Sequence, residues 1–317
     1  MISFITRRRA LRASAILAFL TTGGALGETI EISGRFPAQN REASYLRRLA
    51  IDRFRGRDGG QLSNAIGNAL SQARNGSGPH FTLLGDPGAR ADGVLSGSAT
   101  SDWEEHRVQL TRNRCVDRAP AEQGKKEGKC VKYDNVPVQC TERTTSLTAS
   151  LRIVRTRDGA IVYTETKPRS ETISWCPGES PSRSAEATIA SMIDGIAGEV
   201  RGEIAPHGET YKTRYREDRA GLPKPLSDRF KAVLKQTKSD SAGACAGWAS
   251  IDREQPGQHA ILFNMGLCAE ERGEYPQAID LYRRAGAAKR GDDVNTGIGR
   301  AQALIAGAED DARFRQR

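Results

Sequence analysis

The sequence lacks the short motifs that identify most enzymes and nucleotide-binding proteins. It contains no G-x-x-x-x-G-K-[ST] or G-x-G-x-x-G phosphate loop, no H-E-x-x-H metal motif and no G-x-S-x-G nucleophile motif. Its four histidines are scattered, and no two cysteines have the C-x-x-C spacing of a metal site. These absences favour a protein that has no catalytic centre, no metal and no cofactor.

Two acids keep an enzymatic alternative open. Asp52 lies on one expected strand and Asp92 just before another, so the pair could meet at one end of a sheet. Two carboxylates are the minimum for glycoside hydrolysis, but solvated acids at strand ends are the favoured interpretation. A hydrolase with an unrecognised site is therefore the third of three hypotheses.

Long apolar runs are also missing after residue 27, so no membrane-spanning helix is expected there. Residues 1–27 combine a basic cluster (residues 7–12), an apolar run (Ala13–Leu20) and small residues before Gly27. This order is typical of a secretory signal peptide cleaved near Gly27. The apolar run is short for a membrane anchor. The arginine cluster also resembles a twin-arginine signal, but the general secretory route is favoured, and a periplasmic location follows.

The net charge gives little support for nucleic-acid binding. The whole chain carries +9, but four of its arginines and none of its acids lie in residues 1–27, which leaves +5 after cleavage. A nucleic-acid-binding protein normally concentrates its basic residues on one face. An exported chain with a mild excess of positive charge is expected to bind proteins instead.

All six cysteines follow the signal peptide, and an even number in an exported chain predicts disulfides. Cys115 and Cys130 flank a polar loop, so their bond would close a hairpin. The preferred pairing therefore joins Cys115 to Cys130 and Cys140 to Cys176. The crossed set, with Cys115 bonded to Cys140 and Cys130 to Cys176, also fits neighbouring strands.

Residues 129–176 predict a long β-hairpin. Apolar and polar residues alternate over 146–153, which is typical of a strand with one buried face. The Asp158-Gly159 pair indicates the turn. If Arg157 faces Ala160, Cys140 and Cys176 come within one residue of direct opposition, and a disulfide can close the hairpin.

The C-terminal part resembles a tetratricopeptide repeat in the order and spacing of its apolar and small residues. We expect one clear repeat over 259–292, a degenerate one over about 225–258, and a partial helix pair after them; an unrelated helical hairpin is the alternative. Cys245 and Cys268 would then lie on adjacent helices, either bonded or as two buried thiols. The residues expected to pack between the helices are Ala244, Trp248, Leu262, Met265, Gly266, Ala278, Tyr282 and Ala285.

The sequence therefore predicts an α+β N-terminal domain with long hairpins and flanking helices, followed by an all-α module. Helices are expected over about 61–73 and 184–203, and strands precede and separate them. The expected units are the signal peptide (1–27), a disulfide-stapled α/β domain (28–208), a linker (209–224) and the tetratricopeptide-like module (225–317).

The order of elements over about residues 45–205 resembles the family of curli-secretion components and related outer-membrane activators of penicillin-binding proteins. Ala91–Gly97 is similar to an Ala-Asp strand of that family, and Val154–Tyr163 is similar to its Asp-Gly hairpin. The resemblance implies an α/β fold and a role in the cell envelope. Two departures stand out: no lipid-accepting cysteine follows the signal, and residues 104–140 carry charges on both faces, unlike the lipid-facing hairpins of a pore.

These observations favour a non-enzymatic periplasmic adaptor or scaffold for envelope assembly. Tetratricopeptide grooves usually hold peptides, so the expected partner is a protein or peptide bound by the C-terminal repeats. Peripheral association with outer-membrane components is also expected. The second hypothesis is a structural subunit of an outer-membrane secretion or appendage complex.

Overall fold

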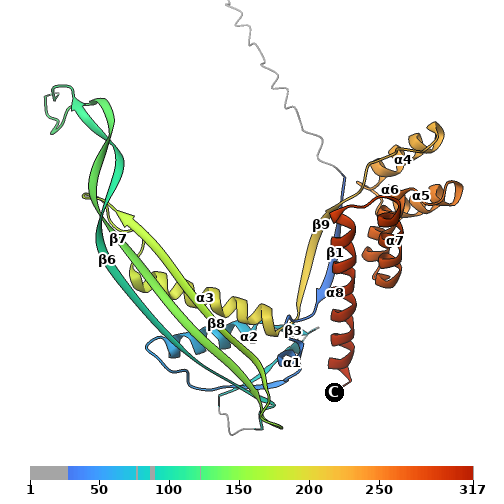
Figure 1. Ribbon diagram of the computed structural model, residues 1–317, viewed down its shortest axis with the longest axis horizontal. Helices are drawn as coiled ribbons and strands as arrows, with labels where there is room; N and C mark the ends of the chain where they lie inside the picture. The colour runs from blue at the N-terminus through green and yellow to red at the C-terminus, as the bar shows by residue number, and fades with distance from the viewer. Residues whose placement is uncertain (1–27, 76–77, 86–89, 122, 317) are drawn as a thin grey trace, which may run out of the picture.

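The computed structural model describes residues 28–75, 78–85, 90–121 and 123–316. The predicted signal peptide lies outside the described residues. A sheet-rich N-terminal region is followed by a C-terminal region of helices (Figure 1), so the predicted fold class is confirmed. Within the described ranges, no helix is long and apolar enough to cross a membrane.

The main sheet has the strand order β5-β2-β6-β7-β8. Its parallel part pairs β2 (Arg48–Ile51) with β5 (Thr82–Leu84) and with the start of β6 (Gly93–Arg118). Its antiparallel part joins β6, β7 (Cys130–Arg155) and β8 (Ile161–Trp175). The sequence predicts two extended segments, one before and one after residue 102. In the structure they form the single 26-residue strand β6.

The turn between β7 and β8 is longer than the predicted two-residue turn. Arg155 N donates to Ala160 O, and Gly159 has a φ of +70°, which glycine adopts readily. A register shift follows Ile153. The predicted pairing of Arg157 with Ala160 is therefore wrong, and every later pair of β7 and β8 moves by one position.

Two helices cover one face of this sheet, and α1 (Arg41–Ser44) lies at its edge (Figure 1). The two covering helices are α2 (Gly59–Ser71) and α3 (Ala185–Ile204). At the start of α3, the Ser184 side chain accepts a hydrogen bond from Ala187 N. Alternate residues of β7 are buried against these helices, so the opposite sheet face is exposed. The core between them includes Leu62, Ile66, Leu70, Leu95, Leu147, Leu151, Ile153, Ile193, Ile196 and Val200.

A two-stranded antiparallel ribbon connects the sheet to the C-terminal helices. It consists of β1 (Thr29–Phe36) and β9 (His207–Arg214), paired over their full length. Ile30 and Ile32 of β1 are buried in the same core as residues of the C-terminal helices. A further short ribbon pairs β3 (Arg74–Asn75) with β4 (Gly78–Pro79).

The helical module, residues 224–315, consists of helices that each pack on the next along the chain. The longest, α8, lies beside β1 and ends near α1 (Figure 1). The segment 209–224, expected as a linker, contains most of β9 and an extended stretch. The helices are α4 (Lys224–Gln236), α5 (Ser241–Glu254), α6 (His259–Glu271), α7 (Tyr275–Ala288) and α8 (Asp292–Arg315).

Candidate functional site

The β6–β7 hairpin continues past the end of β8 as a two-stranded projection, here called the arm and defined as residues 108–121 and 123–140 (Figure 1). The last residue of β8, Trp175, pairs with Thr141, whereas β6 and β7 stay paired as far as Arg118 and Cys130. A two-stranded ribbon has little core of its own and is marginally stable alone. The arm therefore needs other constraints to keep its shape.

Disulfides supply those constraints. Cys140–Cys176 closes the base of the arm, and Cys115–Cys130 joins its two strands near the tip. The third bond, Cys245–Cys268, links α5 to α6. The first two bonds are those of the preferred pairing, and the third is one of the two alternatives left open for Cys245 and Cys268. Such bonds are typical of proteins folded in an oxidising compartment outside the cytosol.

The tip of the arm exposes apolar side chains. Val116, Val131 and Tyr133 are 46%, 61% and 64% exposed, and they are three of the five large hydrophobic residues exposed in the described part of the chain. The strand pairing skips Val116 and Val131, so neither valine has a partner across the ribbon. Charged residues, including Asp117 and Lys132, surround them. An apolar group bordered by charges is typical of a contact surface.

Strand β1 packs against the helical module, including α6, which is the first helix of the predicted repeat. β1 contacts both α6 and α8. A Cβ atom on Gly34 would lie 2.1 Å from Leu304 Cδ2, and one on Gly307 would lie 2.0 Å from Arg35 O, so β1 and α8 pack at close range. Strand β1 therefore belongs to the core of the module, although the sequence places it some 200 residues away.

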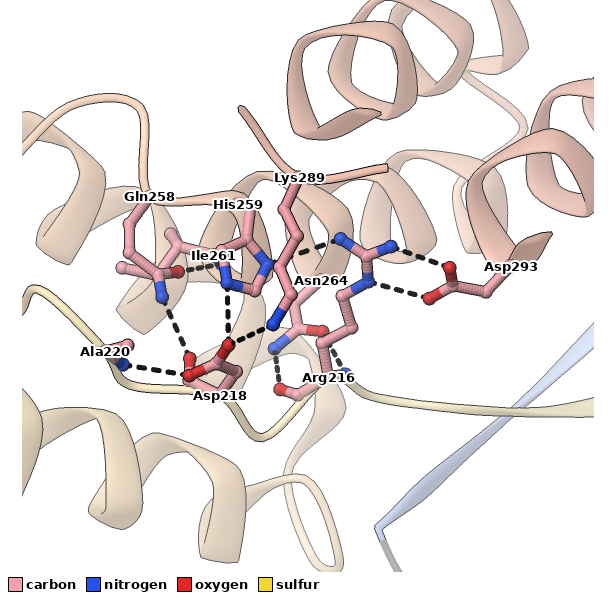
Figure 2. A network of polar contacts seen from close by, with 9 residues as sticks. All are labelled: Arg216, Asp218, Ala220, Gln258, His259, Ile261, Asn264, Lys289 and Asp293. Carbon is pink, nitrogen blue, oxygen red and sulfur yellow. Dashed lines mark hydrogen bonds and ion pairs between the residues drawn. The ribbon is translucent and has the colours of Figure 1, made fainter. Parts of the chain in front are cut away.

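The segment after β9 lies along α6, and an amide side chain binds its backbone (Figure 2). Asn264 Oδ1 accepts from Arg216 N at 2.8 Å, and Asn264 Nδ2 donates to Arg216 O at 3.0 Å. Gln258 Nε2 donates to Asp218 O at 2.9 Å. Side-chain amides that pair with an extended backbone in this way can hold a peptide. In this molecule, the peptide is the protein's own residues 215–220.

Ionic contacts reinforce the same segment (Figure 2). The Asp218 carboxylate lies 2.7 Å from Lys289 Nζ and 2.9 Å from His259 Nε2. The hydrogen bond from Lys289, followed by that from Ala220 N, holds the pKa of Asp218 well below its usual range. Arg216 pairs with Asp293 at 2.6 Å. The network therefore ties residues 216 and 218 to α6, to the end of α7 and to the start of α8.

A buried carboxylate joins β9 to three helices. Glu270 on α6 is fully buried and accepts hydrogen bonds from Arg300 on α8, Tyr211 on β9 and Tyr282 on α7. Burial, together with the nearby Glu270 charge, raises the pKa of both tyrosines. The sequence analysis did not single out Glu270; its only signal was an acid at the end of an apolar helix.

The end of α8 is fixed to the N-terminal region. Arg41 and Tyr45 both donate to Asp310, and the His80 ring stacks on Phe314 with centroids 5.1 Å apart. His80 Nε2 lies 3.0 Å from Ser44 Oγ, and burial lowers the pKa of His80 to about 4. These contacts connect α8 to α1 and to the segment just before β5, as well as to β1.

The residues expected to pack between repeats lie inside the module. Gly266 allows Tyr282 to approach closely, since a Cβ atom there would lie 2.5 Å from Tyr282 Cε1. Met265 is partly buried and packs against both helical cores. The remaining predicted packing residues are buried: Ala244, Trp248, Leu262, Ala278, Tyr282 and Ala285.

The two candidate catalytic acids do not meet. Asp92 precedes β6 and binds Arg48 N and the Arg48 guanidinium at the start of β2, whereas Asp52 follows the end of β2. Because β2 and β6 run parallel, the four residues of β2, about 13 Å of strand, separate the two carboxylates. The meeting of the two acids, which the enzymatic alternative required, does not occur. No group of three or more His, Cys, Asp or Glu side chains suited to a metal ion occurs among the residues described.

Comparison with known proteins gives structural likeness without a family. No family model and no curated protein matches the chain. The PelC dodecamer from Paraburkholderia phytofirmans is 14% identical and covers 55% of this chain and 96% of its own, with a TM-score of 0.24. A minor lipoprotein from Acinetobacter baumannii is 14% identical and covers 49% of this chain and 89% of its own, with a TM-score of 0.24. The likenesses to the curli-secretion family and to tetratricopeptide repeats stay predictions.

Proposed function

We propose that the protein is an exported, non-enzymatic adaptor of the cell envelope, and that it contacts a protein partner through the tip of the arm. The observation that carries this proposal is the exposure of Val116, Val131 and Tyr133 near the end of a disulfide-bound projection. Holding apolar side chains in water lowers stability. A partner that covers them restores the lost hydrophobic contribution.

A protein is the partner that best fits this tip. Tyrosine is enriched at protein interfaces because it offers a large contact area and loses little conformational entropy. The arm is held by bonds at its base and near its tip, so little ordering entropy is lost on binding. Periplasmic location and peripheral association with outer-membrane components are part of the proposal, because the disulfides are compatible with export.

The contact is assigned to the arm in preference to the repeats because of what already lies on α6. Ten of the thirteen residues of α6 are buried, and Asn264 and Gln258 bind the backbone of residues 215–220. A peptide partner at this surface would have to displace that segment. The arm has no such competitor among the described residues.

Site-specific photocrosslinking in living cells tests the proposal. A photoreactive phenylalanine at position 133 should give a discrete adduct, and the same residue at Arg253, exposed on α5, should give none. Val131→Ser should then reduce the adduct at position 133 without changing the circular dichroism spectrum. No adduct from position 133, or equal adducts from both positions, would contradict the proposal.

One observation favours a structural subunit as a second candidate. β8 is an edge strand of 15 residues, and the outer edge of β6 has no strand partner after Ser98 in the described sheet. Free edges can pair with another copy of the chain. Light scattering of the purified protein distinguishes the two: a ring of fixed stoichiometry supports the subunit, and a monomer supports the adaptor.

A further inference from the structure

The exposed face of the main sheet carries a regular array of hydroxyl groups. On β6, β7 and β8, most of the residues that point away from α2 and α3 are serine or threonine, and they stand side by side in the strand register. The exceptions on this face include Asp102, Glu104, Arg152 and Pro168. One row contains Ser98, Ser150 and Thr166, and another contains Asp102, Ser146 and Ser170. Such a face can donate and accept many hydrogen bonds but offers little apolar surface.

Three arginines border one end of this array. Arg55 forms a parallel bridge with Ser98, so it extends the Ser98 row, and Arg53 lies two residues before it. Arg152 stands opposite both Ser96 and Thr164. The three arginines come from β7 and from the segment after β2, and topology alone brings them together.

The arginines line a groove of about 410 Å³ that runs over β6, β7 and β8. Their side chains are exposed, and none of the three guanidinium groups makes an ion pair with the described residues. Asp52 and Glu165 also line the groove, so cations exceed acids by one. Some exposed arginines elsewhere have a carboxylate partner, for example Arg229 with Glu254 and Arg272 with Glu274, whereas others, such as Arg201, form no ion pair with the described residues.

We infer that this groove binds an acidic polysaccharide. Guanidinium groups recognise carboxylates through paired, charge-assisted hydrogen bonds. Serine and threonine hydroxyls match the hydroxyl groups of sugar rings, which both donate and accept. The groove is open along the sheet, so a chain can pass through it with its ends free.

Other ligands fit this surface less well. A lipid needs apolar surface, and the residues around the groove are mostly charged or hydroxyl-bearing. A single-stranded nucleic acid is expected to use aromatic stacking, and no aromatic side chain among the described residues lines the groove. An acidic peptide offers the carboxylates but has few hydroxyls to satisfy the array, so it is the closest competitor.

Calorimetry with the mature chain tests the inference. The probe is polygalacturonate oligomers; dextran supplies the hydroxyls without charge, and poly-glutamate supplies the charge without sugar. Polygalacturonate should bind, and binding should weaken as salt rises from 50 to 500 mM. Dextran and poly-glutamate should each bind at least about ten-fold more weakly, a difference of about 1.4 kcal/mol.

Variants locate the site. Each of Arg53→Gln, Arg55→Gln and Arg152→Gln should weaken binding roughly three- to five-fold, in line with exposed charge pairs. The triple variant should abolish detectable binding. Arg201→Gln, exposed on α3 across the sheet, is the matched control and should bind like the parent.

The inference is overturned if polygalacturonate does not bind, if dextran or poly-glutamate binds equally well, or if the triple variant binds unchanged. The groove and the arm are tested separately. Val131→Ser, in the arm, should leave polygalacturonate binding unchanged, so either proposal can fail without the other.

Discussion

Cys140 lies directly opposite Cys176, with Cα atoms 4.2 Å apart, because the register that pairs Thr141 with Trp175 continues for one more position. The bond encloses the whole β7–β8 hairpin and fixes the point where the arm leaves the sheet. Its removal in Cys140→Ser/Cys176→Ser should lower the free energy of unfolding by about 2–4 kcal/mol, because the unfolded chain gains conformational freedom. Urea denaturation measures this change.

The bond near the tip provides the comparison. Cys115–Cys130 lies far from the main core, so the arm tip can open while the sheet stays folded. Cys115→Ser/Cys130→Ser should therefore speed hydrogen exchange of residues 110–136 while that of β7 residues 147–153 stays slow. Equal loss of protection in both regions would show that the arm and the sheet unfold as one unit.

Glu270 provides a second prediction. Glu270→Gln keeps the shape of the side chain but leaves the Arg300 charge buried without a counter-charge. Breaking a buried pair in this way costs about 3–5 kcal/mol. Glu274→Gln, at an exposed pair with Arg272, is the matched control and should cost about 1 kcal/mol or less. If the two variants unfold at the same urea concentration, the buried cluster does not stabilise the module.

Asn264 provides a prediction about the segment that lies on α6. Asn264→Ala removes both hydrogen bonds to the Arg216 backbone, and each buried polar group that loses its partner costs about 1–3 kcal/mol. Hydrogen exchange of residues 215–220 should accelerate more than that of α7. Asn295→Ala, exposed on α8, should leave both rates unchanged. Unaltered exchange of residues 215–220 in Asn264→Ala would mean that the β1–β9 ribbon alone holds the segment.

Local patterns predicted the parts of this fold that depend on neighbours in the sequence. The alternation over 146–153 is reproduced in the burial of β7, and the small residues Gly266 and Ala278 lie between helices, as their spacing indicated. Such patterns report which face of an element is buried. They do not report which distant element covers it.

The long-range relationships could not be predicted for that reason. Ile30 and Ile32 alternate with polar residues, which is typical of a strand, but nothing in their spacing identifies α6 and α8 as their neighbours. Asp52 and Asp92 could have met at one end of the sheet as far as their positions in the sequence show, but the parallel direction of β2 and β6 places them at opposite ends of β2. The one-residue error in the β7–β8 register came from the turn, whose length the Asp-Gly pair does not determine.

His80 gives the molecule a predictable response to acid. Its ring is 4% exposed, and burial lowers its pKa from about 6.5 to about 4, so the folded state holds it neutral. Between these two values the unfolded chain binds the proton more readily. Stability should therefore fall as pH falls through this window, by about 2 kcal/mol between pH 7.5 and pH 5.0. Asp218, whose pKa lies below its usual range, stays ionised over the same interval.

Urea denaturation at pH 7.5 and 5.0 measures this loss, and His80→Gln isolates its source. The variant loses the stacking on Phe314, so it should be less stable at both pH values, but the difference between them should shrink by about 2 kcal/mol. His106→Gln, at a half-exposed ring beside Glu142, is the control for the loss of a histidine side chain outside this contact. If His80→Gln loses as much stability on acidification as the parent does, the proton responsible binds elsewhere and the contact between α8 and the sheet is not the acid-sensitive one.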